Sequence, residues 1–408
     1  VLLVLPIALQ AQEFDPPLIT QADRHNFDRT QYRTFQQALG QTNPNAADRA
    51  ILQEGARQYL YSLTLEELRD NLPDVTEDLV NDLYSTLASE NGRRIVCQEI
   101  VNLAPNLLPE PGTRLGQPDI VRLNLAIMLR RLNIRTQSAQ QAAVPFVPAM
   151  TALLKILNDP TSRGDAMYWA ADGLGRICDA AQPGVTDGDL GVVQRTEIAE
   201  ALVAALGTDQ AKDDRTRFVT LQIVDSLGDC GLAKNIAGQP VFADALMNVL
   251  RNENELDVVR AMAALSLSRL GRVSNQTSLS SGVDFERLFA DVMSLTGELA
   301  NKMRTGPGVH TRRAIVLIYF SFNGEHPLQA RQQQTGWNNQ IQRNGLGPYR
   351  ARVESAYQIL LPMFQEVLSN ENPRISDPMI NGIDGWLQDP ANVPQGIAAP
   401  GNPDPNPN

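Results

Sequence analysis

The chain has 408 residues, more than one compact hydrophobic core usually holds, which predicts either several domains or an extended array of repeats. Aromatic residues make up only 5% of it, which favours thin layers of stacked helices over one deep core. The formal net charge of -11 repels phosphate backbones, and no cluster of Lys and Arg with interleaved aromatic residues offsets it, so we expect no nucleic acid partner.

The N-terminal residues VLLVLPIALQA form a short apolar run that ends at Ala11. A run of this length followed by a small residue is typical of the hydrophobic region and cleavage site of a signal peptide. It is too short to span a bilayer, which needs about 20 apolar residues. We therefore interpret residues 1–11 as a signal-peptide remnant and expect an exported protein, periplasmic or extracellular, with no transmembrane anchor. A buried N-terminal helix or strand is the alternative interpretation.

Residues 12–47 are polar and rich in Gln, Asn, Asp and Pro. We interpret them as a polar N-terminal extension with at most one short helix, around residues 30–39. Regular helix is expected from about residue 48, where apolar residues recur at helical spacing. The sequence T-L-E-E matches a capping box, in which Thr64 and Glu67 satisfy each other's free backbone donors.

The sequence then contains a repeated unit. Three segments share an Asp followed three residues later by Arg, and a Leu ten residues after that Arg: residues 119–133, 214–228 and 257–271. In the last two segments Gly228 and Gly271 follow that Leu, where glycine is typical of a helix C-cap. Each segment is expected to form the first helix of a repeated helix pair.

Two further segments keep only part of this pattern. Residues 161–175 have Gly164 where the Arg is expected, and residues 310–324 keep Arg313 but have His310 in place of the Asp. Successive Arg-equivalent positions are therefore spaced by roughly 42 to 53 residues. Between successive first helices lies a segment with an apolar stripe, which we expect to be the second helix of each pair.

A first helix with D-x-x-R, followed by an apolar second helix, resembles the repeats of the HEAT family, which is defined by architecture and not by activity. The resemblance implies an all-α fold, an α-solenoid of stacked antiparallel helical hairpins, which we assign to residues 48–371. In HEAT repeats the Asp and the Arg bond across neighbouring units. The resemblance therefore implies structural roles for Asp119, Arg122, Asp214, Arg217, Asp257, Arg260 and Arg313.

The sequence shows no pattern that predicts a catalytic, metal or cofactor site. No two of its three histidines lie three or four residues apart, so no helical pair of metal ligands can form. Its three cysteines include no C-x-x-C pair, which argues against a zinc site and a c-type haem. P-loop, G-x-S-x-G and G-x-G-x-x-G motifs are missing too. We therefore expect a protein that is not an enzyme and binds no cofactor.

One loop, T-D-G-D-L-G at residues 186–191, has a feature of hard-cation sites, because Asp187 and Asp189 lie two residues apart beside glycine. It lacks the distal Glu that an EF-hand loop requires. A turn with solvated carboxylates is the favoured interpretation, and cation binding by this loop is left open.

The connections from first to second helices are long, and long loops without secondary structure are usually functional or disordered. The longest, residues 324–348, carries a tryptophan among Gln and Asn residues. We therefore predict a partner-binding surface at Trp337, Asn338, Asn339 and Gln340. The tryptophan has two interpretations: it packs onto the repeat stack, or it is an exposed anchor for the partner.

Two cysteines fall at nearly equivalent places in consecutive units, because Cys178 and Cys230 lie 14 and 13 residues after Gly164 and Arg217. Packed helices run about 8–10 Å apart, slightly more than a disulfide spans, but both cysteines are expected near helix ends, where chains can converge. A disulfide and a pair of buried thiols are both open interpretations. Cys97 is expected to stay reduced and buried.

Residues 372–408 are expected to form a C-terminal segment ending in a disordered tail, because the last residues are rich in Pro, Asn and Gly. From the repeat pattern and the missing catalytic motifs we expect an exported, non-catalytic scaffold or adaptor that binds another protein. The alternatives are a structural or assembly subunit of a large extracytoplasmic complex and, as a third candidate, a HEAT-like enzyme such as a lyase.

Overall fold

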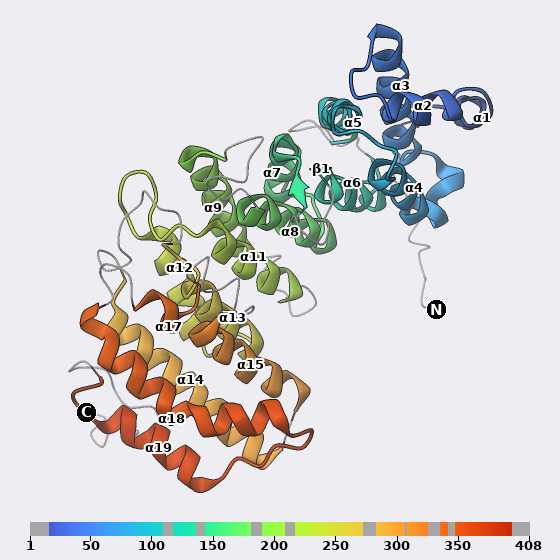
Figure 1. The fold of residues 1–408 in the computed structure, drawn as a ribbon. Coiled ribbons are helices and arrows are strands. Elements are labelled where there is room, and N and C mark those ends of the chain that lie inside the picture. Colours follow the sequence, from blue (N-terminus) through green and yellow to red (C-terminus); the bar gives the residue numbers. More distant parts are fainter. Residues whose placement is uncertain are drawn as a thin grey trace, which may run out of the picture. The chain divides into compact units, whose positions relative to one another are not determined.

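The computed structural model describes residues 16–108, 117–135, 143–180, 190–208, 217–271, 283–306, 308–324, 335–341 and 347–393. These residues are mostly helical, and the predicted all-α class is confirmed (Figure 1). Among them, strands β1 (Asn133–Arg135) and β2 (Val144–Pro145) form one short antiparallel pair. None of the described helices is long and apolar enough to cross a membrane.

The chain divides into two compact units, and the division falls within α8 (Gly164–Ala180). Unit 1 runs to Gly173, and unit 2 begins at Leu174. The predicted signal-peptide remnant, residues 1–11, and the tail after residue 393 lie outside the described residues.

Unit 1 contains short and medium helices before α8. They are α1 (Gln21–Thr30), α2 (Tyr32–Leu39), α3 (Ala46–Ser62), α4 (Leu72–Tyr84), α5 (Glu90–Leu103), α6 (Asp119–Arg131) and α7 (Met150–Asn158), with the 3-10 turns η1 (Glu66–Asn71), η2 (Ala104–Leu107) and η3 (Val147–Ala149).

Residues 16–47 are more ordered than the polar extension that we expected, because they form both α1 and α2. Two aromatic residues among the polar ones anchor them: Phe27 and Phe35 are fully buried, with ring centroids 6.0 Å apart. Capping boxes start α1 at Thr20 and α3 at Asn45, each with Asp three residues later. Helix α2 matches the short helix expected around residues 30–39, whereas α1 was missed because Phe27 is the buried residue of an otherwise polar helix.

The capping box predicted at Thr64 does not form. The Thr64 hydroxyl instead accepts a hydrogen bond from the Leu18 backbone N–H at 3.0 Å and donates to the Tyr61 carbonyl at 2.7 Å. The 3-10 turn η1 begins after Leu65, without a side-chain cap. Thr64 therefore ties the segment before α1 to the end of α3, a tertiary contact that outcompetes the local one.

Unit 2 contains the C-terminal end of α8 and the remaining helices. They are α9 (Val192–Leu206), α11 (Arg217–Cys230), α12 (Val241–Arg251), α13 (Asp257–Leu267), α14 (Phe285–Thr305), α15 (Val309–Asn323), α17 (Trp337–Gln340), α18 (Arg350–Ser369) and α19 (Asp377–Gln388), with the 3-10 turn η6 (Gly347–Tyr349).

Within unit 2, the first helices α11 and α13 run side by side in the same direction (Figure 1). Their starts are joined where Arg217 Nη1 donates to the Asn254 carbonyl at 3.4 Å. Their ends are joined where the Gly271 N–H donates to the Gly231 carbonyl at 2.8 Å. Helix α14 runs the other way against α13, because Lys302 near its end pairs with Asp257 at the start of α13, 2.8 Å away.

Gly228 was expected to be a C-cap, but it lies inside α11, which continues to Cys230. A Cβ atom at Gly228 would lie only 2.7 Å from the Ser266 Cβ and 2.8 Å from the Ser266 Cα on α13. The glycine therefore permits the close approach of two helices instead of ending one. Gly271 and Gly324, at φ 75° and 77°, do follow the ends of their helices with the left-handed backbone expected of glycine.

We predict that Gly228→Ala lowers the free energy of unfolding by about 1–3 kcal/mol, because the added methyl group must push α11 from α13. Urea denaturation followed by helical circular dichroism measures the change. Gly385→Ala in α19 is the matched control: no atom lies within 4 Å of its Cβ position, so it should stabilise by about 1 kcal/mol through helix propensity. Equal stability of Gly228→Ala and the natural chain would contradict the close-packing role.

Candidate functional site

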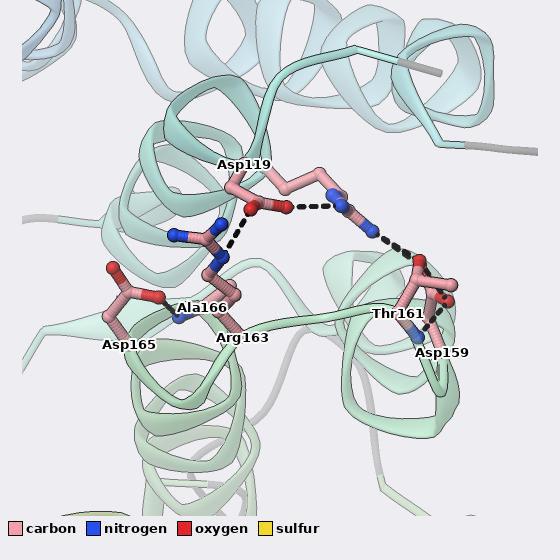
Figure 2. Close-up of polar contacts among 7 residues, drawn as sticks. Asp119, Asp159, Thr161, Arg163, Asp165 and Ala166 are labelled. Atoms are coloured by element: carbon pink, nitrogen blue, oxygen red, sulfur yellow. Dashed lines mark hydrogen bonds and ion pairs between the residues drawn. The ribbon is translucent and has the colours of Figure 1, made fainter. Parts of the chain in front are cut away.

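In unit 1, the first predicted Asp-Arg pair forms a polar network at the start of α6 (Figure 2). Arg122 is buried, and its Nη1 donates to Asp159 Oδ2 at 2.9 Å and to Thr161 Oγ1 at 2.6 Å. Asp119 accepts from the other end of the Arg122 guanidinium and from Arg163. The network fastens α6 to the turn between α7 and α8, which is a structural role.

In unit 2, the equivalent arginines also reach forward along the chain. Arg260 is buried; it donates to Glu298 Oε2 at 2.7 Å and to the Leu250 carbonyl at 3.0 Å. The bonds of Arg122 to Asp159, Arg217 to Asn254 and Arg260 to Glu298 span 37, 37 and 38 residues. The three bonds thus join residues at nearly the same separation along the chain.

The predicted ladder is incomplete. Asp257 pairs with Lys302 and not with the arginine of a neighbouring unit. Asp214 lies outside the described residues. Arg313 is exposed, and the described part of the chain offers its side chain no hydrogen bond or ion pair. The ladder therefore does not continue at the last repeat, where His310 already replaces the Asp.

The structure decides between the two interpretations of Trp337. Its side chain is 0% exposed and packs edge-on against Phe289 and Phe322, with ring centroids 5.1 and 5.0 Å away. A fully buried ring cannot touch a partner, so the expectation of an exposed anchor is wrong for this residue. The polar residues on both sides of Trp337 in the sequence gave no sign that it belongs to the core.

The neighbours of Trp337 also bond inward. Gln340 is buried, and its Nε2 donates to the Ser268 and Leu270 carbonyls, 2.5 and 3.2 Å away, after the end of α13. The Nδ2 atoms of Asn338 and Asn339, which are half-buried, donate to Asn323 Oδ1 and to the Thr335 carbonyl. Residues 335–341 therefore cap the ends of first helices; residues 325–334 and 342–346 of the predicted loop surface lie outside the described residues.

Cys178 and Cys230 meet inside unit 2. Their Sγ atoms are 3.4 Å apart, and both side chains are 0% exposed. Burial raises the pKa of the Cys230 thiol well above its ordinary value, and the hydrogen bond with the Cys178 thiol raises it further. Cys97 is also fully buried, and burial raises the pKa of its thiol to about 12. All three are free thiols in this structure.

A buried carboxylate cluster in unit 1 escaped the sequence analysis. Asp82 on α4 accepts from the hydroxyls of Tyr59 and Tyr32 at 2.6 and 2.9 Å, and from Gln36 Nε2 at 3.2 Å. Burial raises the pKa of Tyr32 to about 12 and that of Tyr59 further, so both remain proton donors. The Asp82 carboxylate therefore accepts its hydrogen bonds from side chains of unit 1, and these bonds join α2, α3 and α4. Asp82 among the apolar residues of α4 was the only available sequence signal.

No group of three or more His, Cys, Asp or Glu residues in the described ranges is arranged to hold a metal ion. Asp187 and Asp189, the candidate cation loop, lie outside those ranges, as does His326. His25 and His310 are both exposed.

Four of the six large apolar side chains that are exposed among the described residues of unit 2 lie on one side, where first helices begin. Leu256 is 43% exposed at the start of α13, Val309 is 82% exposed at the start of α15, and Phe218 is 45% exposed at the start of α11. Leu368 is 44% exposed near the end of α18. These four residues define what we call the helix-start edge.

Three contacts bring these helix ends together. Arg217 bonds to the Asn254 carbonyl, and Lys302 pairs with Asp257, which link the starts of α11 and α13 and the end of α14. Arg312 Nη1 donates to the Glu371 carbonyl at 3.2 Å, which links the start of α15 to the end of α18. Helix α14 ends at Thr305 and α15 begins at Val309, which joins the two groups, so the helix-start edge extends across α11, α13, α15 and α18.

A pocket of about 300 Å³ opens at this edge, lined by Met303, Arg304, Asn372, Pro373, Arg374 and Ile375. Arg304 Nη1 pairs with Asp377 at 2.7 Å, whereas the Arg374 side chain has no bonded partner among the described residues. Arg313 lies one helical turn from Val309 and is also exposed. The exposed guanidinium groups of Arg313 and Arg374 thus have no bonded carboxylate among the described residues.

The sequence matches no protein-family model, no curated protein and no solved structure. The comparisons therefore give no indication of function, and the resemblance to HEAT repeats rests on the residues of this chain alone.

We predict that Arg122→Ala lowers the free energy of unfolding by about 2–3 kcal/mol, because it leaves the Asp159 carboxylate without its arginine partner and removes buried charge-assisted hydrogen bonds. Urea denaturation measures the loss. Arg350→Ala breaks the exposed pair with Glu354 and serves as the control, with an expected change below about 0.5 kcal/mol. If both substitutions cost the same, Arg122 has no special role in fastening α6.

Proposed function

We propose that this chain is an exported, non-catalytic adaptor whose HEAT-like α-solenoid binds another protein along the helix-start edge of unit 2. The solenoid proposal is supported by the recurrence of arginine bonds 37, 37 and 38 residues forward in the chain. Two helix directions also support it. Helices α11 and α13 run parallel, and α14, which follows α13 in the sequence, runs antiparallel to it.

The observation that carries the binding proposal is the grouping of exposed apolar side chains on adjoining helix ends. Single exposed apolar residues are normal on soluble proteins. Apolar side chains that recur on neighbouring helices and are rimmed by polar groups are typical of interaction sites. Val309, at 82% exposed, has the largest exposed fraction among them and would form the centre of the contact.

The rim indicates the chemistry of the partner. Arg313 and Arg374 have no bonded carboxylate among the described residues, and Arg312 bonds only to a backbone carbonyl. Guanidinium groups prefer carboxylates, which they can bind through two parallel hydrogen bonds. We therefore propose that the partner binds through a segment that carries Asp or Glu beside apolar side chains. A second copy of this chain fits less well, because its own charge of -11 repels another copy.

We predict that a photo-crosslinking amino acid at position 309 captures, in the cells that make the protein, a heterologous segment rich in Asp and Glu. Mass spectrometry identifies the captured peptide. Arg374→Glu should reduce capture by about tenfold or more, because it turns attraction into repulsion next to the contact.

The matched control is the same crosslinker at Val193, which is 67% exposed at the start of α9. That helix begins near the opposite ends of the first helices, because Arg195 Nη1 donates to the Cys230 carbonyl at 3.3 Å. Capture at position 193 but not 309, capture of a second copy alone, or a captured segment without excess negative charge would each overturn the proposal.

A further inference from the structure

The two cysteines of unit 2 lie on neighbouring helices. Cys178 is two residues before the end of α8, and Cys230 is the last residue of α11. Their sulfur atoms, 3.4 Å apart, are already in contact, although the residues are 52 positions apart in the chain. The third cysteine, Cys97, belongs to unit 1 and bonds to neither.

At the usual packing distance, helices α8 and α11 would lie slightly too far apart for a disulfide, which spans Cα atoms up to about 7 Å apart. Here a glycine removes the obstacle. A Cβ atom at Gly175 on α8 would lie 2.7 Å from the Ser226 Oγ on α11, so the two backbones approach more closely than larger residues permit. Both cysteines follow this close approach within about one helical turn.

We infer that Cys178 and Cys230 form an intramolecular disulfide, which ties α8 to α11 when the chain folds in the presence of a low-molecular-weight disulfide such as oxidised glutathione. Neither the repeat architecture nor the proposed binding edge is needed for this inference, because it rests on the contact between the two sulfur atoms.

The reaction is two thiol–disulfide exchanges. One cysteine thiolate attacks the glutathione disulfide, which forms a mixed disulfide and releases one glutathione thiolate. The second cysteine thiolate attacks the cysteine sulfur of that mixed disulfide, which forms the Cys178–Cys230 bond and releases the second glutathione thiolate. The protein loses two protons and two electrons, and the oxidised glutathione is reduced to two thiols.

Burial determines when this reaction takes place. Both thiols are 0% exposed in the folded chain, so a soluble oxidant cannot reach them there. Exchange therefore belongs to folding, when the thiols are still accessible and the approach of α8 to α11 brings them together. The same burial then protects the finished bond from soluble reductants.

The test refolds the full chain from urea in buffers of stepped reduced-to-oxidised glutathione ratio. The product is quenched with acid, unfolded and alkylated without reductant, and its intact mass and alkylated peptides are measured. We expect the loss of two hydrogen atoms and one alkylated cysteine, Cys97. Three alkylated cysteines at every ratio, a stable glutathione adduct on Cys178 or Cys230, or a bond that includes Cys97 would overturn the inference.

Two variants and a thermal measurement complete the test. Cys97→Ala should keep the bond, and Cys178→Ser should leave Cys97 and Cys230 both alkylated. The oxidised natural chain should melt on the order of 5–10 °C above the reduced chain, because the bond restricts the unfolded state. Unchanged melting on reduction would mean that the bond does not tie the helices. The mass measurement on the natural chain stands even where Cys178→Ser folds poorly.

Discussion

The close approach of successive first helices in unit 2 is the constraint on which much of its structure depends. Gly228 faces Ser266, and Gly175 faces Ser226, at distances that leave no room for a Cβ atom on the glycine side. Small residues at these places let the backbones approach and increase dispersion contact along both helices. The same approach brings Cys178 to Cys230 and lets Gly271 bond to Gly231 at the helix ends.

Buried arginines add a second constraint, which acts along the chain. A guanidinium is costly to bury unless its donors are bonded, so each arginine requires acceptors at a defined place. Arg122 finds carboxylate and hydroxyl oxygens in the α7–α8 turn, and Arg260 finds Glu298 on α14. The acceptors differ in type while the separation stays near 37 residues. The separation along the chain is therefore more constant than the identity of the acceptor.

The two sides of unit 2 differ in how fully their apolar side chains are buried. At the ends of the first helices, residues 335–341 bury Trp337 and donate the Gln340 amide to the Ser268 and Leu270 carbonyls, so that this segment completes the core. At the starts of the first helices, Leu256 and Val309 remain exposed beside arginines. An apolar surface that the described residues leave exposed is the better candidate for a partner, which is why we propose binding there.

The sequence by itself determined the helical class and the positions of several first helices, and its resemblance to HEAT repeats implied structural roles for Arg122 and Arg260. These follow from apolar spacing and from the D-x-x-R register, which are local properties of a helix. It also indicated that Cys178 and Cys230 occupy equivalent places. Only the tertiary structure decided that Phe27 and Phe35 order the N-terminal segment and that Gly228 lets two helices approach closely instead of ending one. It alone placed Trp337 in the core, because burial depends on side chains from distant helices, here Phe289 and Phe322, which no local pattern around a polar loop can reveal.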